Sequence, residues 1–507
     1  MRLYIGLLGA MATALFSSHR SGLSVAIVSM AKYNSSAHKH DSDGQCWQPD
    51  STGSSQGNDS SVDAVIIRGE FDWSESLQGI ILGSSFYMYL VTPTLSGRIT
   101  ERFGSKWVTL VSLTAPAVLY SLIPTVARTS VYLLIALLVI MGFFHGCIFA
   151  SLFPLLANWF TPAERTIAVA ALAAGQNFGN LFTFPLAGYL CDNGFAGGWP
   201  SVFYVISAAH IPWIVMWLLC VEDTPLLSNT CGFIKCTDSE LKYIYYNKGS
   251  FGSPNKSSSA PWRHIFTSRC VWATIICKVC ASWGYYLYQT KMPSYLDKVF
   301  GMSLLSNGLF NAGLSLSTGV TMVLGGPLSA LVIKKFGHRL TKTRVRKLFE
   351  STALIGPAIC LAIITVMGCN SAAVVSLLMT ALFFYGFVTG GEFSIYGEFA
   401  PDFSGTIFGI AATLASIPAF IGPYAVGVIL GDTPGERSRW NVVFYITIAI
   451  YLIGAVGFEM LASAEPQHWG VIGNIDGYDT SSVNTFNSDC IDKERYKITT
   501  IDEVIDE

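Results

Sequence analysis

The stretch GRITERFGSK, residues 97–106, returns later in the chain in a related form as ALVIKKFGHR, residues 330–339. Both copies begin with a small residue, place a charged and a basic residue before Phe-Gly, and end on a basic residue. Each copy also connects two long apolar runs. A motif that recurs at matching positions predicts two repeated halves of the chain, and its basic residues favour the cytoplasmic surface of a membrane.

Five residues of the first copy form a candidate conformational motif: Gly97, Glu101, Arg102, Gly104 and Lys106. The glycine after Phe allows a tight reversal between two helices. Glu101 can pair with an arginine, or cap a neighbouring helix, in one state of a moving protein. The alternative is that the basic residues only fix topology. For the second copy, which lacks the acid, both interpretations stay open.

Composition places the chain in a membrane. Of 507 residues, 51% are hydrophobic and 13% are charged, the mean hydropathy is +0.47 and the net charge is −2. A soluble domain is usually about 25% charged, so these values exclude a soluble enzyme and a disordered protein. The balanced charge gives no basic field for a nucleic acid. No metal site is expected, because Cys231 and Cys236 have neither the CxxC spacing nor a following histidine pair.

Twelve apolar runs approach the roughly 20 residues that a spanning helix needs. They are 3–31, 76–97, 107–127, 130–160, 166–191, 199–221, 270–296, 303–333, 347–369, 372–398, 404–430 and 440–461. The first run also resembles a signal peptide, but no A-x-A cleavage site follows it, so we expect a retained helix. A longer native N-terminus stays open.

The runs predict an all-α polytopic membrane protein with twelve transmembrane helices in two six-helix halves. The first half covers 1–221 with an outer loop at 32–75, and a cytoplasmic linker covers 222–269. The second half covers 270–464, and the polar tail, 465–507, is expected to be disordered. With both termini in the cytoplasm, the inner loops hold 17 Lys and Arg residues and the outer loops hold 7, as the positive-inside rule requires. The sequons at Asn34 and Asn58 then lie outside as glycosylation sites, and the sequon at Asn255 lies inside.

The repeated loop resembles the signature of the major facilitator superfamily, and further stretches resemble its anion:cation symporter family. That family includes sialin, the vesicular glutamate transporters and the sodium–phosphate cotransporters. The matching stretches are 20–30 (RSGLSVAIVSM), 79–89 (GIILGSSFYMY), 158–166 (NWFTPAERT), 223–225 (DTP), 282–286 (SWGYY), 345–347 (VRK) and 400–401 (AP). The resemblance covers nearly the whole chain outside the first loop and the tail.

The resemblance implies a secondary transporter that moves a small organic anion or phosphate by alternating access, coupled to H⁺ or Na⁺. It implies no cofactor and no nucleic-acid partner, and we expect a monomer in the plasma membrane or in a lysosomal or vesicle membrane. An enzyme is not expected, because the sequence has no HExxH, GxSxG or P-loop motif. The alternative is a non-transporting receptor or sensor on the same scaffold. This alternative is favoured by the missing arginines and glutamate: Leu138 stands where many relatives carry an arginine, and Ala281 where the vesicular glutamate transporters carry one. His145 stands where the family has a glutamate.

Arg20 is the candidate anchor for the anion. A guanidinium stays charged and grips a carboxylate or phosphate with two donors, and Arg20 matches the family's first-helix arginine, which is linked to the anionic substrate. The alternative, a side chain that reaches the outer interface, requires about 11 residues of helix or roughly 16 Å, which is too far. The neighbouring His19 points about 100° around the helix and is expected to pack or to form a hydrogen bond.

Two residues are candidates for proton coupling. His145 aligns with a family glutamate tied to proton coupling, and an imidazole titrates near physiological pH. Its alternative is a structural histidine between glycines. Glu392 lies at membrane depth where the family usually has an apolar residue, and it either carries a proton or pairs with a Lys or Arg.

The remaining candidates for substrate binding are polar residues at membrane depth. Lys278 either replaces the missing arginine or only faces a cavity. Asn177 is a candidate cavity residue on a helix face whose small residues also indicate packing, and Tyr87 and Tyr286 either donate hydroxyls to the substrate or pack. Lys291 is expected to reach the outer interface.

Overall fold

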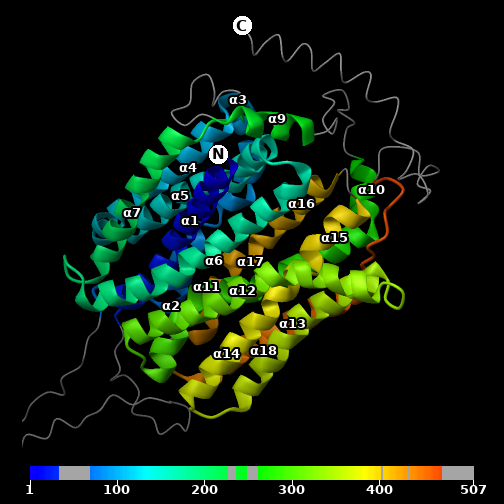
Figure 1. Cartoon of the computed structure of the whole chain (residues 1–507). Helices are drawn as coiled ribbons and strands as arrows, with labels where there is room; N and C mark the ends of the chain where they lie inside the picture. Colours follow the sequence, from blue (N-terminus) through cyan, green and yellow to red (C-terminus); the bar gives the residue numbers. More distant parts are fainter. Residues whose placement is uncertain (33–68, 226–235, 248–260, 401–402, 432, 471–507) are drawn as a thin grey trace, which may run out of the picture.

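The computed structural model describes residues 1–32, 69–225, 236–247, 261–400, 403–431 and 433–470, and this part of the chain is helical apart from one isolated β-bridge (Figure 1). The elements of its first half are α1 (Arg2–Met30), α2 (Glu75–Ser84), η2 (Met88–Leu90), α3 (Thr92–Phe103), α4 (Ser105–Thr129), α5 (Val131–Trp159), α6 (Pro162–Asn193) and α7 (Trp199–Cys220). The later elements are α9 (Asp238–Asn247), α10 (Trp262–Thr267), α11 (Arg269–Phe300), α12 (Leu304–Phe336), α13 (Lys342–Val366), α14 (Ser371–Tyr385), η3 (Gly386–Thr389), α15 (Glu392–Phe399), α16 (Ser404–Ala415), α17 (Ile417–Leu430) and α18 (Arg437–Leu461). The all-helical prediction is confirmed.

Nine helical segments of the described chain are long and apolar enough to cross a membrane. They are α4, α5, α7, α11, α12, α13, α14–α15, α16–α17 and α18. Of the other predicted spans, α1 and α6 have the length, but their polar residues lower their hydropathy. Those residues face each other: Ser17 donates to Asn180 Oδ1 at 2.5 Å, Ser21 donates to the same oxygen, and Thr183 donates to Ser18 Oγ at 2.7 Å.

Three predicted spans are interrupted helices. The second span breaks into α2, η2 and α3, and Pro93 lies in the first turn of α3, where a missing N–H costs nothing. The tenth span breaks at Gly390 and Gly391 before α15. The eleventh breaks at Ser416, and Pro418 lies in the first turn of α17. Interrupted helices in transporters expose backbone groups near the binding site.

The apolar cores follow the two halves of the chain. One core draws only on residues between Ile265 and Ala464. Two others draw on residues up to Ile244, with Leu304 as the one addition from the second half. Figure 1 shows the blue-to-green helices of the first half beside the green-to-orange helices of the second. A binding site between the halves is therefore built from two separately packed bodies.

The halves meet closely at the end of the molecule where α2 begins, which we call the Glu75 end. Glycines permit the approach: the Gly79 Cα faces the Pro423 backbone, Gly308 of α12 faces the Phe184 backbone on α6, and Gly427 of α17 faces the backbone of Glu75. A side chain at these glycines would collide with the opposite main chain. The structure is therefore closed at the Glu75 end.

Candidate functional site

Arg20 lies on α1 inside a group of aromatic rings. Its guanidinium carbon is 4.2 Å from the ring centroid of Phe86, 4.4 Å from that of Phe16 and 5.1 Å from that of Tyr89. The ring of Tyr286 packs against Phe86 in the same group, with centroids 4.9 Å apart. Its Nε and Nη2 are buried without a hydrogen-bond partner in the described chain. Two unpaired donors held in a cation–π setting are available to an anionic group.

A narrow cavity of about 20 Å³ adjoins Arg20. Its walls come from α1, α2, α4 and α5 of the first half, and Thr290 of α11 closes it from the second half. Leu82 and Leu138 line the cavity, and Arg20 is the only permanently charged residue among its described lining. Because this volume holds about one water, an anion enters only when the surrounding helices separate.

His145 lies on α5 in the wall of this cavity and is 1% exposed. Its Nε2 is 3.2 Å from Nδ1 of His19 on α1, and its ring contacts Phe16 edge-on at 5.0 Å. The structure therefore brings the candidate coupling histidine and the candidate anion anchor to one place.

The other predicted first-half residues lie elsewhere. Tyr87 is 39% exposed and packs on Phe420 of α17, with ring centroids 5.2 Å apart. Asn177 of α6 is buried, donates to the Ala173 carbonyl at 3.3 Å, and approaches Met322 Sδ on α12 at 3.6 Å. Both residues contribute to contacts between the halves, and neither lines the Arg20 cavity. Tyr286 packs instead on Phe86, whose ring lies beside the guanidinium of Arg20.

Lys278 and Glu392 form a buried ion pair in the second half. Lys278 Nζ lies 3.1 Å and 3.2 Å from the two carboxylate oxygens of Glu392, and over the rings of Phe393 and Phe408. A third buried charge was missed by sequence reasoning: Glu350 of α13 is 0% exposed and accepts a hydrogen bond from the backbone N of Glu392 at 2.7 Å. Glu350 thus caps the N-terminus of α15, where a carboxylate is favoured. Glu350 lies inside the predicted span 347–369. The apolar pattern of that span does not indicate which residue Glu350 pairs with.

The candidate conformational motif forms the turn between α3 and α4. Gly104 has φ 82°, a conformation that residues with a Cβ rarely adopt. The backbone N of Lys106 donates to Asp223 at 2.7 Å and its Nζ pairs with Glu222 at 2.6 Å. The backbone of Gly97 and Glu101 belongs to α3, the side chain of Glu101 is outside the described ones, and Arg102 is exposed. The motif therefore ties the α3–α4 turn to the segment after α7.

A related arrangement holds the second half. Arg346 of α13 donates to both carboxylate oxygens of Glu398, at 3.0 Å and 2.7 Å, and to the Gly390 carbonyl at 2.8 Å. This fork joins α13 to the broken helix that carries Glu392. From the sequence, Arg346 was noted only as part of the stretch 345–347 that resembles the family, and its partners were not predicted.

The prediction for Lys291 is wrong. Its side chain is 1% exposed, and its Nζ pairs with Glu75 across the halves at 3.3 Å instead of reaching the outer interface. Lys298, one further α11 residue, also pairs with Glu75. Glu75, a buried acid at the start of α2, keeps Lys291 inside the protein. The hydropathy of the span that contains Lys291 does not reveal this partner.

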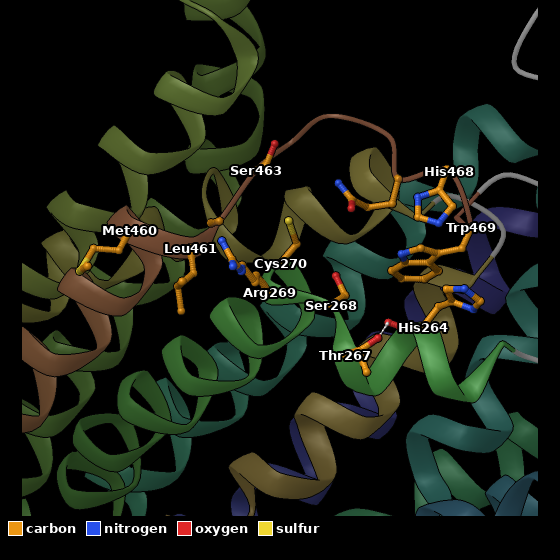
Figure 2. Close-up of a pocket in the computed structure, with 12 residues that line it drawn as sticks. His264, Thr267, Ser268, Arg269, Cys270, Met460, Leu461, Ser463, His468 and Trp469 are labelled. Atoms are coloured by element: carbon orange, nitrogen blue, oxygen red, sulfur yellow. Dashed lines mark hydrogen bonds between the residues drawn. The ribbon is translucent and has the colours of Figure 1, made fainter.

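A larger cavity, of about 500 Å³, lies away from Arg20 at the corner of α10, α11 and the segment after α18. Figure 2 shows His264, His468 and Trp469 gathered at one side of it, with Arg269 near the start of α11. The two imidazole rings are 5.8 Å apart. Since its described lining comes from 264–270 and 460–469 and includes no residue of the first half, this cavity is not part of a path between the halves. The sequons at Asn34, Asn58 and Asn255 lie outside the described residues.

Two helical halves around a membrane-depth arginine define a polytopic solute transporter. The Major Facilitator Superfamily model matches residues 52–423, and the chain belongs to this family. It is a transporter family and not an enzyme family. The predicted family and fold are confirmed.

Among its relatives is the "Uncharacterized transporter slc-17.2" of Caenorhabditis elegans, 32% identical over 422 residues, which are 82% of this chain and 83% of the relative. Sialin of Homo sapiens is 29% identical over 403 residues, 79% of this chain and 78% of sialin. Vesicular glutamate transporter 1 of Xenopus laevis is 28% identical over 408 residues, which are 80% of this chain and 69% of that transporter. A bacterial homologue of the lysosomal transporter Spinster, solved facing inward, has the same fold, with a TM-score of 0.63 over 91% of this chain and 96% of that one at 12% identity.

Proposed function

We propose that this protein is a secondary active transporter that moves a small anion across a membrane by alternating access, coupled to H⁺ or Na⁺. The observation that carries the proposal is Arg20. Two of its donors are buried and have no partner among the described residues, beside a cavity that residues of both halves enclose. An anion that pairs with these donors satisfies them, and the site then passes from one side of the membrane to the other as the halves rock.

The walls of the cavity favour an organic anion over inorganic phosphate. Leu82, Phe86, Leu138 and Met141 present apolar surface beside a single permanent charge. A monoanion with an apolar part matches one guanidinium and these walls, whereas a dianion would leave a charge uncompensated in a low-dielectric site. Lys278 does not supply that second charge in this state, because Glu392 neutralises it.

In the proposed arrangement the halves are 1–221 and 270–464, the protein is a monomer, and both termini lie in the cytoplasm. The membrane is the plasma membrane or that of a lysosome or vesicle. The Lys and Arg asymmetry of the loops supports the orientation.

The test is uptake of labelled anions by proteoliposomes that contain the full chain. The panel compares an aromatic or branched monocarboxylate, a dicarboxylate, an acidic sugar and phosphate, each with and without a pH or Na⁺ gradient. Arg20→Lys keeps the charge but loses the planar fork, so we expect weak uptake with a raised KM. Arg20→Ala is expected to abolish uptake.

The matched control is Arg344→Ala, which removes an exposed arginine and should leave uptake unchanged. Normal uptake by Arg20→Ala would contradict the role of this residue. Binding of an anion by the wild type without uptake under any gradient would indicate the receptor alternative.

A further inference from the structure

Three histidines from three helices meet beside Arg20. They are His19 on α1, His145 on α5 and His210 on α7, and each is at most 2% exposed. The His19 and His145 rings share a hydrogen bond at 3.2 Å, and the His210 ring stacks on His19 with centroids 4.6 Å apart and planes 8° apart. From the sequence, His19 and His145 were predicted separately, and His210 was not predicted.

The hydrogen bonds fix what each ring can do. His210 Nδ1 lies 2.9 Å from the Ile206 carbonyl, which only accepts, so Nδ1 carries a hydrogen and Nε2 has a lone pair when the ring is neutral. In the neutral His19–His145 pair, one of the two facing nitrogens must donate to the other. The outer nitrogens of the pair are those that face away from this hydrogen bond, His19 Nε2 and His145 Nδ1. Whichever ring donates, one outer nitrogen carries a hydrogen and the other has a lone pair.

The outer nitrogens of this pair are free to exchange a proton. His19 Nε2, His145 Nδ1 and His210 Nε2 are buried and have no hydrogen-bond partner in the described chain. A proton that binds at the lone-pair end can leave from the other end after transfer across the shared hydrogen bond. The described residues hold no group of His, Cys, Asp or Glu placed to bind a metal ion, and the shared hydrogen bond itself occupies two ring nitrogens.

The charges around the pair are one-sided. The ionisable groups that face it from the packed helices are Arg20 on α1, Tyr120 on α4 and His210 on α7. The cavity wall from α2 adds none. Because none of these described groups is a carboxylate, Arg20 repels a proton on the pair and no described anionic side chain attracts it. An anion bound at Arg20 reverses this balance.

We propose that the His19–His145 pair, backed by His210, carries the coupled proton, and that the proton and the anion at Arg20 each favour binding of the other. This deepens the proposed function and rests on it, because it commits the coupling ion to H⁺. By linkage, the anion must strengthen proton binding by the same factor by which the proton strengthens anion binding. Coupling of this kind is typically 5–150-fold, so we expect the apparent anion KM to fall roughly tenfold on acidification.

The alternative proton carriers lie in the second half. Glu392 is paired with Lys278, and Glu350 accepts from both the Glu392 backbone and Cys277 Sγ at 3.0 Å. These carboxylates already have local partners, and they do not line the Arg20 cavity. The variants Glu350→Gln and Glu392→Gln therefore test the alternative that a carboxylate of the second half carries the proton.

The test compares two assays on the same proteoliposomes. The first measures proton flux and accumulation of the best labelled anion under a pH gradient. The second measures exchange of labelled for unlabelled anion at equal pH on both sides, which needs an intact anion site and no net proton movement. We expect His145→Gln and His19→Gln to lose accumulation and anion-driven proton flux, to keep exchange at saturating anion, and to show an anion KM independent of pH. His264→Gln, an exposed histidine on α10, is the matched control.

The outcomes separate the two proposals. Proton flux per anion at the wild-type level in the His19→Gln and His145→Gln double variant would overturn the histidine proposal, as would transport driven by Na⁺ alone. Loss of proton flux in Glu350→Gln or Glu392→Gln, with full flux in the double variant, would assign the proton to the second half. If the wild type transports no anion in either assay, the proposed function itself fails.

Discussion

The buried ion cluster between Glu75, Lys291 and Lys298 predicts how the closed end is held. Glu75 is 5% exposed and begins α2, whereas both lysines lie on α11 of the other half. Substitution Glu75→Gln keeps the size of the side chain and removes its charge. Two lysine cations then face an uncharged amide inside a closed interface.

The magnitude follows from burial. Removal of one partner from a buried ion pair costs about 3–5 kcal/mol, because a charge is left uncompensated away from water. In the state that is open at the Glu75 end the lysines are hydrated, so the cost falls on the closed state alone. At 1.4 kcal/mol per factor of ten, the lower figure shifts the balance toward opening by roughly 100-fold.

The assay uses a cysteine behind the cluster. Ser294 of α11 is 4% exposed and lies between the two lysines in sequence, so Ser294→Cys is a nearly isosteric reporter. A membrane-impermeant thiol reagent should label it from the Glu75 side much faster when Glu75→Gln is also present. The single variant Glu75→Gln corrects for labelling of native cysteines.

The matched control is Glu70→Gln at the same end. Glu70 pairs with Arg128, but both side chains are over 40% exposed, and an exposed pair is worth only about 0–1 kcal/mol. Equal labelling of Ser294→Cys in the Glu75→Gln and Glu70→Gln backgrounds would refute the argument that the buried cluster closes this end.

Two further predictions concern the turn and the topology. Gly104→Leu should insert normally yet transport several-fold more slowly at equal surface abundance, because Gly104 has positive φ and a Cβ there would collide with the Asp223 carboxylate; wild-type uptake kinetics would contradict a conformational role for the turn. Expression in a glycosylating cell should give a mass shift that disappears in the Asn34→Gln and Asn58→Gln double variant and persists in Asn255→Gln; a shift lost on Asn255→Gln alone would reverse the orientation.

Much of the fold follows from the sequence. The repeated loop and the apolar runs predict the helices within a few residues; for example, the run 199–221 becomes α7, Trp199–Cys220. The interruptions did not follow, because a span broken at Gly390 and Gly391 has the same hydropathy as a continuous one. Hydropathy averages over a window, whereas a break depends on local backbone groups.

The sequence predicts which charged residues belong to the candidate site, but not which of them contact one another. Arg20, His145, Lys278 and Glu392 stand out because ionisable groups at membrane depth are rare. Their partners depend on how each helix is rotated, at about 100° per residue, and on which helices pack. Residues far apart in sequence therefore meet in ways that no local pattern encodes, as Lys278 and Glu392 do across 114 positions.

Glu75 shows the same difficulty at a span boundary. It stands at the edge of the run 76–97, where an acid is ordinarily solvated and needs no explanation. Contact with α17 and α11 buries it, so a residue that belongs to a loop by hydropathy becomes a contact between the halves. Only the packing of one half on the other gives it that position.

The two buried charge sets have different consequences for transport. In the second half, Lys278 and Glu392 neutralise each other in this structure. In the first half, Arg20 has no acid partner among the described residues, so the empty site carries one positive charge. A bound monoanion cancels that charge, and a proton on the histidine pair restores it. In the proposed cycle the empty and loaded sites therefore have the same net charge, so a membrane potential, which contributes about 2.3 kcal/mol per charge per 100 mV, acts equally on both and cancels over the cycle. A pH gradient would then drive the anion without working against the voltage, which a lone arginine could not achieve.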